Sequence, residues 1–180
     1  MKITTSYKFI ILDFDGTICN LSVDWTSLKN EIILEFDNKY HFPNKKLMSM
    51  FNFINDNDDR SRALSIIEKY EMPDGKVNYS EFNYQLMNEA SEFIVISNNL
   101  TSTINQVLTL ENQINKVKII YGIDKVTQSK PSKEMFDEVL KYCQDADLKN
   151  YLYIGDSEVD KQFAHNCGID FININNLYGQ

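Results

Sequence analysis

The sequence predicts an α/β protein, a doubly wound parallel sheet with a small α-helical cap insertion. Short, near-continuous apolar runs recur along the chain, as expected for strands that helices cover on both faces. Helical patterns separate the later runs, and this alternation implies right-handed crossovers within one parallel sheet. The predicted strands are residues 8–12, 92–96, 117–121, 151–154 and 170–174.

Three segments between the later strands are predicted to be helices. Residues 101–115 carry apolar side chains at helical spacing. Residues 132–143 begin at Ser132, a predicted N-cap. Residues 158–167 end before Gly168, and glycine commonly ends a helix.

The segment from 19 to 89 interrupts the alternation of strand and helix. It has no comparable strand run, and prolines and a Pro-Asp-Gly turn sequence divide it into helical candidates. We therefore predict a core built from residues 1–18 and 90–180, with a helical cap at 19–89. The helical candidates in the cap are residues 25–38, 44–55, 59–71 and 80–89.

Composition narrows the classes of function. A net charge of −8 argues against nucleic-acid binding, which needs a surface that neutralises phosphates. No apolar run is long enough for a membrane span or the core of a signal peptide, so we expect a cytoplasmic protein that does not bind membranes. The three cysteines have no metal-binding spacing, and their odd number argues against a disulfide framework.

Two acidic residues, Asp13 and Asp15, follow the first predicted strand and precede Gly16. Alternate side chains of an extended chain point the same way, so both carboxylates lie on one side. Crowded carboxylates require a cation between them or a retained proton, and Gly16 lets the backbone turn closely around the pair. An ordinary Asp-Gly turn is the alternative for this segment taken alone.

Further polar residues follow other predicted strands. Ser97 and Asn98 follow the second strand, Asp156 follows the fourth, and Lys130 precedes the helix after the third. Ligands bind at the carboxyl edge of such sheets, so these side chains are expected to meet. Taken singly, each has an ordinary alternative: Asp156 as a helix cap, Ser97 as a turn serine and Lys130 as a solvated lysine.

Together these groups resemble the four motifs of the haloacid dehalogenase superfamily. The motifs are residues 13–17, Ser97, Lys130 with its following proline, and residues 155–160, in the family's order and across nearly the whole chain. The insertion resembles the family's first type of cap, as in the phosphoglycolate phosphatase and β-phosphoglucomutase relatives. The resemblance implies a Rossmann-like core, Mg²⁺ as the cofactor and a small phosphorylated substrate.

The resemblance also implies a role for each residue. Asp13 is the expected nucleophile that forms an aspartyl-phosphate, and Asp15 the expected general acid and base. Asp13, the backbone carbonyl of Asp15 and Asp156 are the expected Mg²⁺ ligands. The expected phosphate-binding residues are Ser97, Asn98 and Lys130, and the expected supporting residues are Gly16, Thr17, Gly155 and Asp160.

The function that we expect is a Mg²⁺-dependent phosphatase. Asp15 argues against dehalogenation, which needs no second carboxylate, whereas a phosphomutase uses the same two aspartates and stays open. A phospho-receiver signalling or binding module combines similar groups on a doubly wound sheet. Its phosphorylated aspartate, however, follows an interior strand, and it lacks a large insertion after the first strand.

Overall fold

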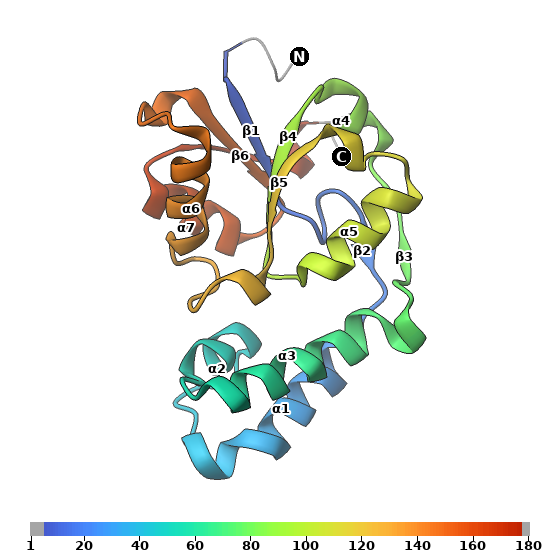
Figure 1. Cartoon of the computed structure of the whole chain (residues 1–180), viewed down its shortest axis with the longest axis vertical. Helices are drawn as coiled ribbons and strands as arrows, with labels where there is room; N and C mark the ends of the chain where they lie inside the picture. Colours follow the sequence, from blue (N-terminus) through green and yellow to red (C-terminus); the bar gives the residue numbers. More distant parts are fainter. Residues whose placement is uncertain (1–5, 178–180) are drawn as a thin grey trace.

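A parallel β-sheet forms the centre of the structure, a computed structural model that describes residues 6–177 (Figure 1). Within those residues the sheet has five strands in the order β5-β4-β1-β6-β7. All of the predicted strands are therefore present, and the predicted fold class is confirmed. The strands are β1 (Phe9–Leu12), β4 (Phe93–Ile96), β5 (Val117–Tyr121), β6 (Tyr151–Gly155) and β7 (Asp170–Asn173).

Helices cover both faces of the sheet, so β1 is buried on each side. Ile10 and Leu12 point into the apolar cluster beneath α4 (Tyr84–Glu89) and α5 (Thr101–Leu110). Phe9 and Ile11 point into the opposite cluster, beneath α6 (Glu134–Cys143) and α7 (Glu158–Cys167). This alternation explains why the strand sequence is apolar at every position. The short helix α8 (Ile174–Leu177) follows β7.

Two of the three helices predicted between the later strands differ from the sequence prediction at one end. The N-cap of α6 is Lys133, because Ser132 lies in a preceding turn in which its backbone N–H donates to Ser129 O at 3.0 Å. The prediction of Ser132 as the N-cap was therefore wrong. Helix α5 stops at Leu110, because Asn112 adopts a left-handed φ of 56°. Gly168 ends α7 at φ 71°, as predicted.

Three helices of the predicted insertion form a separate layer that faces the carboxyl edge of the sheet (Figure 1). They pack around their own apolar cluster, to which the core adds Leu100 and Ile123. Several polar contacts tie this layer to the core, among them Arg60 Nη2, which donates to Val126 O at 2.7 Å, and Ser129 N, which donates to Asn52 Oδ1 at 2.9 Å. The helices are α1 (Trp25–Tyr40), α2 (Leu47–Phe53) and α3 (Asn57–Glu71).

The segment that returns from the helical layer runs beside the segment that enters it. Their short strands, β2 (Asn20–Leu21) and β3 (Tyr79–Ser80), pair in antiparallel fashion. Strands of two residues are too short to give an apolar run, so the sequence pattern did not reveal them. The predicted helix at 80–89 begins only at Tyr84, and its Leu86 and Met87 pack beneath the central sheet. None of the helices within residues 6–177 is both long enough and apolar enough to span a membrane.

The central strand gives the first testable expectation. Ile11 is fully buried between β4 and β6, so we expect Ile11→Ala to lower the free energy of unfolding by about 3 kcal/mol, through lost burial and the cavity left behind. Urea denaturation followed by circular dichroism measures this change. Leu34→Ala is the control, because Leu34 is 81% exposed and the expected change is within about 0.5 kcal/mol. A loss below about 1 kcal/mol for Ile11→Ala would contradict the packing described here.

Candidate active site

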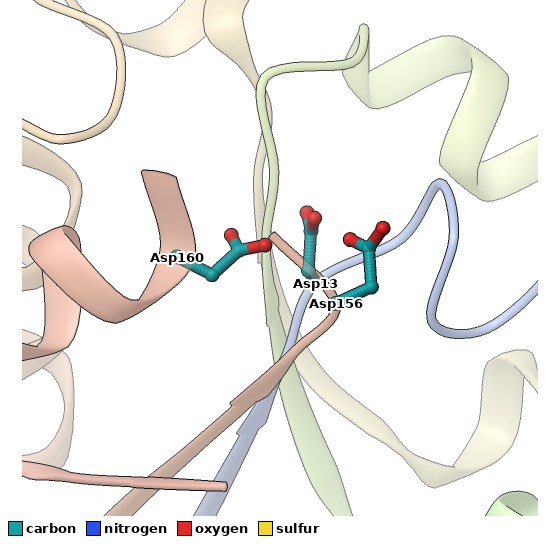
Figure 2. A group of neighbouring side chains, drawn as sticks. All are labelled: Asp13, Asp156 and Asp160. Atoms are coloured by element: carbon teal, nitrogen blue, oxygen red, sulfur yellow. The ribbon is translucent and has the colours of Figure 1, made fainter. Parts of the chain in front are cut away.

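The polar residues that follow β1, β4 and β6 meet at the carboxyl edge of the sheet. Asp13 continues β1, and its backbone N–H donates to Ile154 O of β6 at 2.9 Å. Figure 2 shows the side chain of Asp13 standing beside that of Asp156, with Asp160 reaching toward them from α7. Asp13, Asp15, Ser97, Asn98, Lys130, Asp156 and Asp160 all line one cavity of about 310 Å³. The structure thus brings together every polar side chain for which a direct role was predicted.

Lys130 lies at the centre of this site and is only 3% exposed. Its Nζ atom forms ion pairs with Asp13 Oδ1 at 2.8 Å and with Asp160 Oδ1 at 2.5 Å. It also donates to the hydroxyl of Tyr153 at 2.7 Å, and that hydroxyl lies 2.9 Å from Ile96 O. A lysine ammonium has three donors, so each of them has an oxygen neighbour here.

The two carboxylates beside Lys130 differ in their remaining partners. Asp160 Oδ2 accepts from the backbone N–H of Ser157 at 3.1 Å and from its hydroxyl at 2.6 Å. Burial disfavours the charge on Asp160, but Lys130 and Ser157 together lower the pKa of Asp160 below its usual value. Burial raises the pKa of Asp13 to about 7, opposed by the Lys130 ammonium and reinforced by the charge of Asp160. Of these two carboxyl groups, Asp13 is therefore the one whose pKa is raised.

Asp156 is not the cap of the helix that follows it. Ser157 is the N-cap of α7 and forms a reciprocal capping box with Asp160. Asp156 instead lies against Gly16, and a Cβ atom added at residue 16 would lie 2.5 Å from Asp156 Oδ2. Gly16 also has a φ of 79°, so both its backbone conformation and this close approach require glycine.

The acidic group fits a divalent cation. Asp13, Asp156 and Asp160 each offer a carboxylate oxygen, and these oxygens lie within 4.8 Å of one another. Hard oxygen ligands of this kind suit Mg²⁺. Asp160 is already engaged by Lys130 and Ser157, so Asp13 and Asp156 are the better matched ligand pair. Burial raises the pKa of Asp156, with a smaller contribution from the charge of Asp160, and a bound cation would oppose that shift.

Asp15 is held by the segment that leads to the helical layer. Its Oδ1 accepts from the backbone N–H of Leu21 in β2 at 2.8 Å, and the side chain lines the cavity. Burial raises the pKa of Asp15, which favours a protonated carboxyl group that can donate. Thr17 supports the turn beside it: its backbone N–H donates to Phe14 O at 3.2 Å, and its carbonyl oxygen accepts from Asn83 Nδ2 at 3.3 Å.

The loop after β4 carries the remaining predicted residues. The Ser97 hydroxyl is buried and donates to Asn99 Oδ1 at 2.9 Å. Asn98 lines the cavity, and its Oδ1 accepts from the backbone N–H of Lys130 at 2.9 Å, so this side chain also positions Lys130. Gly155 approaches Asp160 so closely that a Cβ atom would lie 2.6 Å from the aspartate Cβ. Gly155 therefore permits the burial of Asp160.

Two residues that position this site were absent from the sequence prediction. Tyr153 forms hydrogen bonds with Lys130 and Asp160. The sequence signal that could have identified it is a tyrosine hydroxyl within a predicted buried strand, where the hydroxyl needs a hydrogen-bond partner. Glu71, at the end of α3, is buried and accepts from Asn99 Nδ2 at 2.8 Å and from Leu100 N at 3.0 Å. Glu71 follows Ala63 and Ile67 at intervals of four residues, which places it on the buried face of α3.

A family model for haloacid dehalogenase-like hydrolases matches residues 10–174 of this chain. No curated protein sequence matches this chain. Among solved structures, a protein provisionally named a haloacid dehalogenase-like hydrolase, from Bacteroides fragilis, is 22% identical with a TM-score of 0.65. The match covers 92% of this chain and 86% of that one.

Two further solved structures have the same fold. A protein provisionally named a phosphoglycolate phosphatase, from Lactobacillus plantarum, is 16% identical with a TM-score of 0.64, and the match covers 94% of this chain and 87% of that one. CbbY from Rhodobacter sphaeroides, in complex with phosphate, is 14% identical with a TM-score of 0.60, and the match covers 93% of this chain and 85% of that one. At these identities the structures show a shared fold.

The raised pKa of Asp13 predicts how stability depends on pH when a chelator removes metal ions. The folded-state value of about 7 lies above the usual unfolded value of about 4, so the folded protein binds more protons between these limits. The free energy of unfolding contributed by Asp13 therefore falls as pH rises through that interval. We expect the Tm of Asp13→Asn, relative to the unmodified protein, to be higher at pH 8 than at pH 5. Thermal melts in EDTA measure this difference, and an equal Tm difference at both pH values would contradict it.

The burial of Asp160 gives a second expectation. Asp160→Asn removes one charge from a buried ion pair, and we expect it to lower the free energy of unfolding by about 3 kcal/mol. Urea denaturation measures this loss. Asp137→Asn is the matched control, because Asp137 pairs with Lys133 on the exposed surface of α6, where an ion pair contributes about 0–1 kcal/mol. Equal losses for the two variants would show that Asp160 is not a buried structural partner of Lys130.

Proposed function

The chain belongs to the haloacid dehalogenase-like hydrolases, and we propose that it is a Mg²⁺-dependent phosphatase that cleaves a small phosphate monoester. The observation that carries this proposal is the cavity in which Asp13, Asp15 and Asp156 face the same space as Lys130. Phosphoryl transfer needs a placed nucleophile, positive charge near the phosphoryl oxygens and a proton for the leaving oxygen. The side chains at this cavity offer the nucleophile, the proton and part of the charge.

Asp13 and Asp156 would bind Mg²⁺, together with the backbone carbonyl of Asp15 as predicted from the sequence. When bound, Mg²⁺ neutralises charge on the phosphoryl oxygens and so lowers the repulsion between an anionic nucleophile and an anionic substrate. Lys130 adds a fixed positive charge beside Asp13, where Asp160 and Tyr153 hold it. Ser97 offers a hydroxyl at the same cavity to a phosphoryl oxygen.

The first step is attack by a carboxylate oxygen of Asp13 on phosphorus, while the bond from phosphorus to the ester oxygen breaks. Asp15 gives its proton to that oxygen, and the alcohol leaves. In the second step Asp15 takes a proton from water, whose oxygen attacks phosphorus. The bond from phosphorus to Asp13 then breaks, which releases inorganic phosphate and restores both carboxyl groups.

A phosphomutase would share the first step but would pass the phosphoryl group to a second hydroxyl of a sugar phosphate. Residues 10–174 match a family of hydrolases, which favours transfer to water and also argues against a signalling module. The protein from Lactobacillus plantarum carries the provisional name of a phosphatase, which agrees with this choice.

Phosphate release from p-nitrophenyl phosphate tests the proposal. We expect release with Mg²⁺, loss of release in excess EDTA, and a fall of about 10³-fold or more in Asp13→Asn, because the nucleophile is removed. Asp137→Asn, on the surface of α6, is the control and should retain the original rate. Activity that survives both the chelator and Asp13→Asn would refute the mechanism.

The two roles of Asp15 can be separated with the same substrate. Nitrophenolate leaves readily without a proton, so Asp15→Asn should slow the attack of water more than the first step. We therefore expect phosphate to accumulate on Asp13 in this variant, detectable by mass spectrometry after acid quenching. A variant that lacks both turnover and phosphorylated Asp13 would show that Asp15 is needed before the phosphoenzyme forms.

A further inference from the structure

The space above the carboxylates has apolar walls. Leu47 and Met48 of α2, Trp25 of α1 and Val159 of α7 line the same cavity as Asp13 and Lys130. Leu47, Met48 and Val159 also line an adjoining cavity of about 610 Å³, to whose outer part Asn52 and Gln162 add polar side chains. Trp25 is 37% exposed and Val159 is 43% exposed, so both present apolar surface to this space. A group bonded to a phosphate at Asp13 would therefore extend along hydrocarbon.

The same walls offer little positive charge to a second anionic group. Among the described residues that line the two cavities, the cations are Lys130 and Lys46. Lys130 already has Asp13, Asp160 and Tyr153 as its oxygen neighbours. Lys46 is exposed and lines only the adjoining cavity, which Glu158 also lines. A carboxylate on the leaving group would meet apolar side chains and the acidic floor of the site, where an unpaired charge is costly.

We infer that the substrate is the phosphate monoester of an uncharged, largely apolar alcohol, whose hydrocarbon packs against Trp25, Leu47, Met48 and Val159. This inference rests on the proposed phosphatase function and specifies the substrate class. Acidic leaving groups such as glycolate are poorer substrates, because the only cation among these described lining residues besides Lys130 is the exposed Lys46, whose charge water screens. Polyhydroxylated leaving groups gain less from these contacts, because a hydroxyl that faces Trp25, Leu47, Met48 or Val159 finds no hydrogen-bond partner on those side chains.

Three phosphate esters whose leaving alkoxides have similar basicity test the contacts of the leaving group: 2-phenylethyl phosphate, phosphoglycolate and glycerol phosphate. Bond cleavage makes similar demands in all three, so differences in kcat/KM report the surroundings of the leaving group. We expect kcat/KM for 2-phenylethyl phosphate to exceed the other two by about tenfold or more, which is the discrimination that an apolar pocket commonly achieves. Trp25→Ala should remove most of this preference.

The substitution Val159→Lys adds a positive charge to the wall of both cavities. We expect it to raise kcat/KM for phosphoglycolate and to lower that for 2-phenylethyl phosphate, since an ammonium replaces an isopropyl group in the wall. Leu34→Ala is the matched control, because Leu34 lies on α1 with Trp25 but is highly exposed and lines neither cavity. It should leave the order of the three esters unchanged.

Trp25 is the only tryptophan in the sequence, so its fluorescence gives a readout that does not depend on turnover. In Asp13→Asn with Mg²⁺, 2-phenylethyl phosphate should change this fluorescence and bind at least tenfold more tightly than phosphoglycolate. Phosphoglycolate that binds or reacts as well as 2-phenylethyl phosphate would overturn the inference but leave the phosphatase function standing. A protein that hydrolyses none of the three esters, nor p-nitrophenyl phosphate, would overturn both.

Discussion

The site depends on one buried ammonium group placed between two carboxylates. Lys130 reaches Asp13 at the end of the central strand and Asp160 in the first turn of α7, and Tyr153 of β6 completes its set of partners. A charge removed from water must be paired, so this contact fixes a loop, a strand end and a helix relative to one another. The packing of the sheet and the geometry of the site are thus linked through a single side chain.

The two carboxylates have unequal support, and this difference separates their roles. Ser157 provides Asp160 with two further donors, so the negative charge is stable on Asp160. Asp13 shares the same ammonium, and its burial outweighs that contact and raises its pKa to about 7. A carboxylate with incomplete compensation binds a cation or reacts with an electrophile more readily than one that is fully paired. Asp160 accordingly belongs to the framework, and Asp13 is the carboxyl group that we propose as the nucleophile.

Apolar runs were enough to predict the parallel sheet, because a strand buried on both faces is apolar at every position. The same reasoning placed Asp13 and Asp156 at one edge, since both follow parallel strands. It did not reveal that Asp160 is buried, because an acidic residue in the first turn of a helix is usually exposed. Nor did it identify Glu71 as a partner of the loop after β4, because that contact joins residues 28 positions apart and depends on how the helical layer sits on the core.

The helical layer is attached to the core at two ends that differ in their access to water. At one end of α3, buried Glu71 holds Asn99 and Leu100, whereas at the other end the contacts of Arg60 and Asn52 are only partly buried. Water competes for the partly buried contacts far more readily than for the buried ones. Helix α3 has 15 residues and is therefore about 22 Å long. A rotation of α3 by roughly 10° about its buried end at Glu71 therefore moves its other end, next to α2, by about 4 Å.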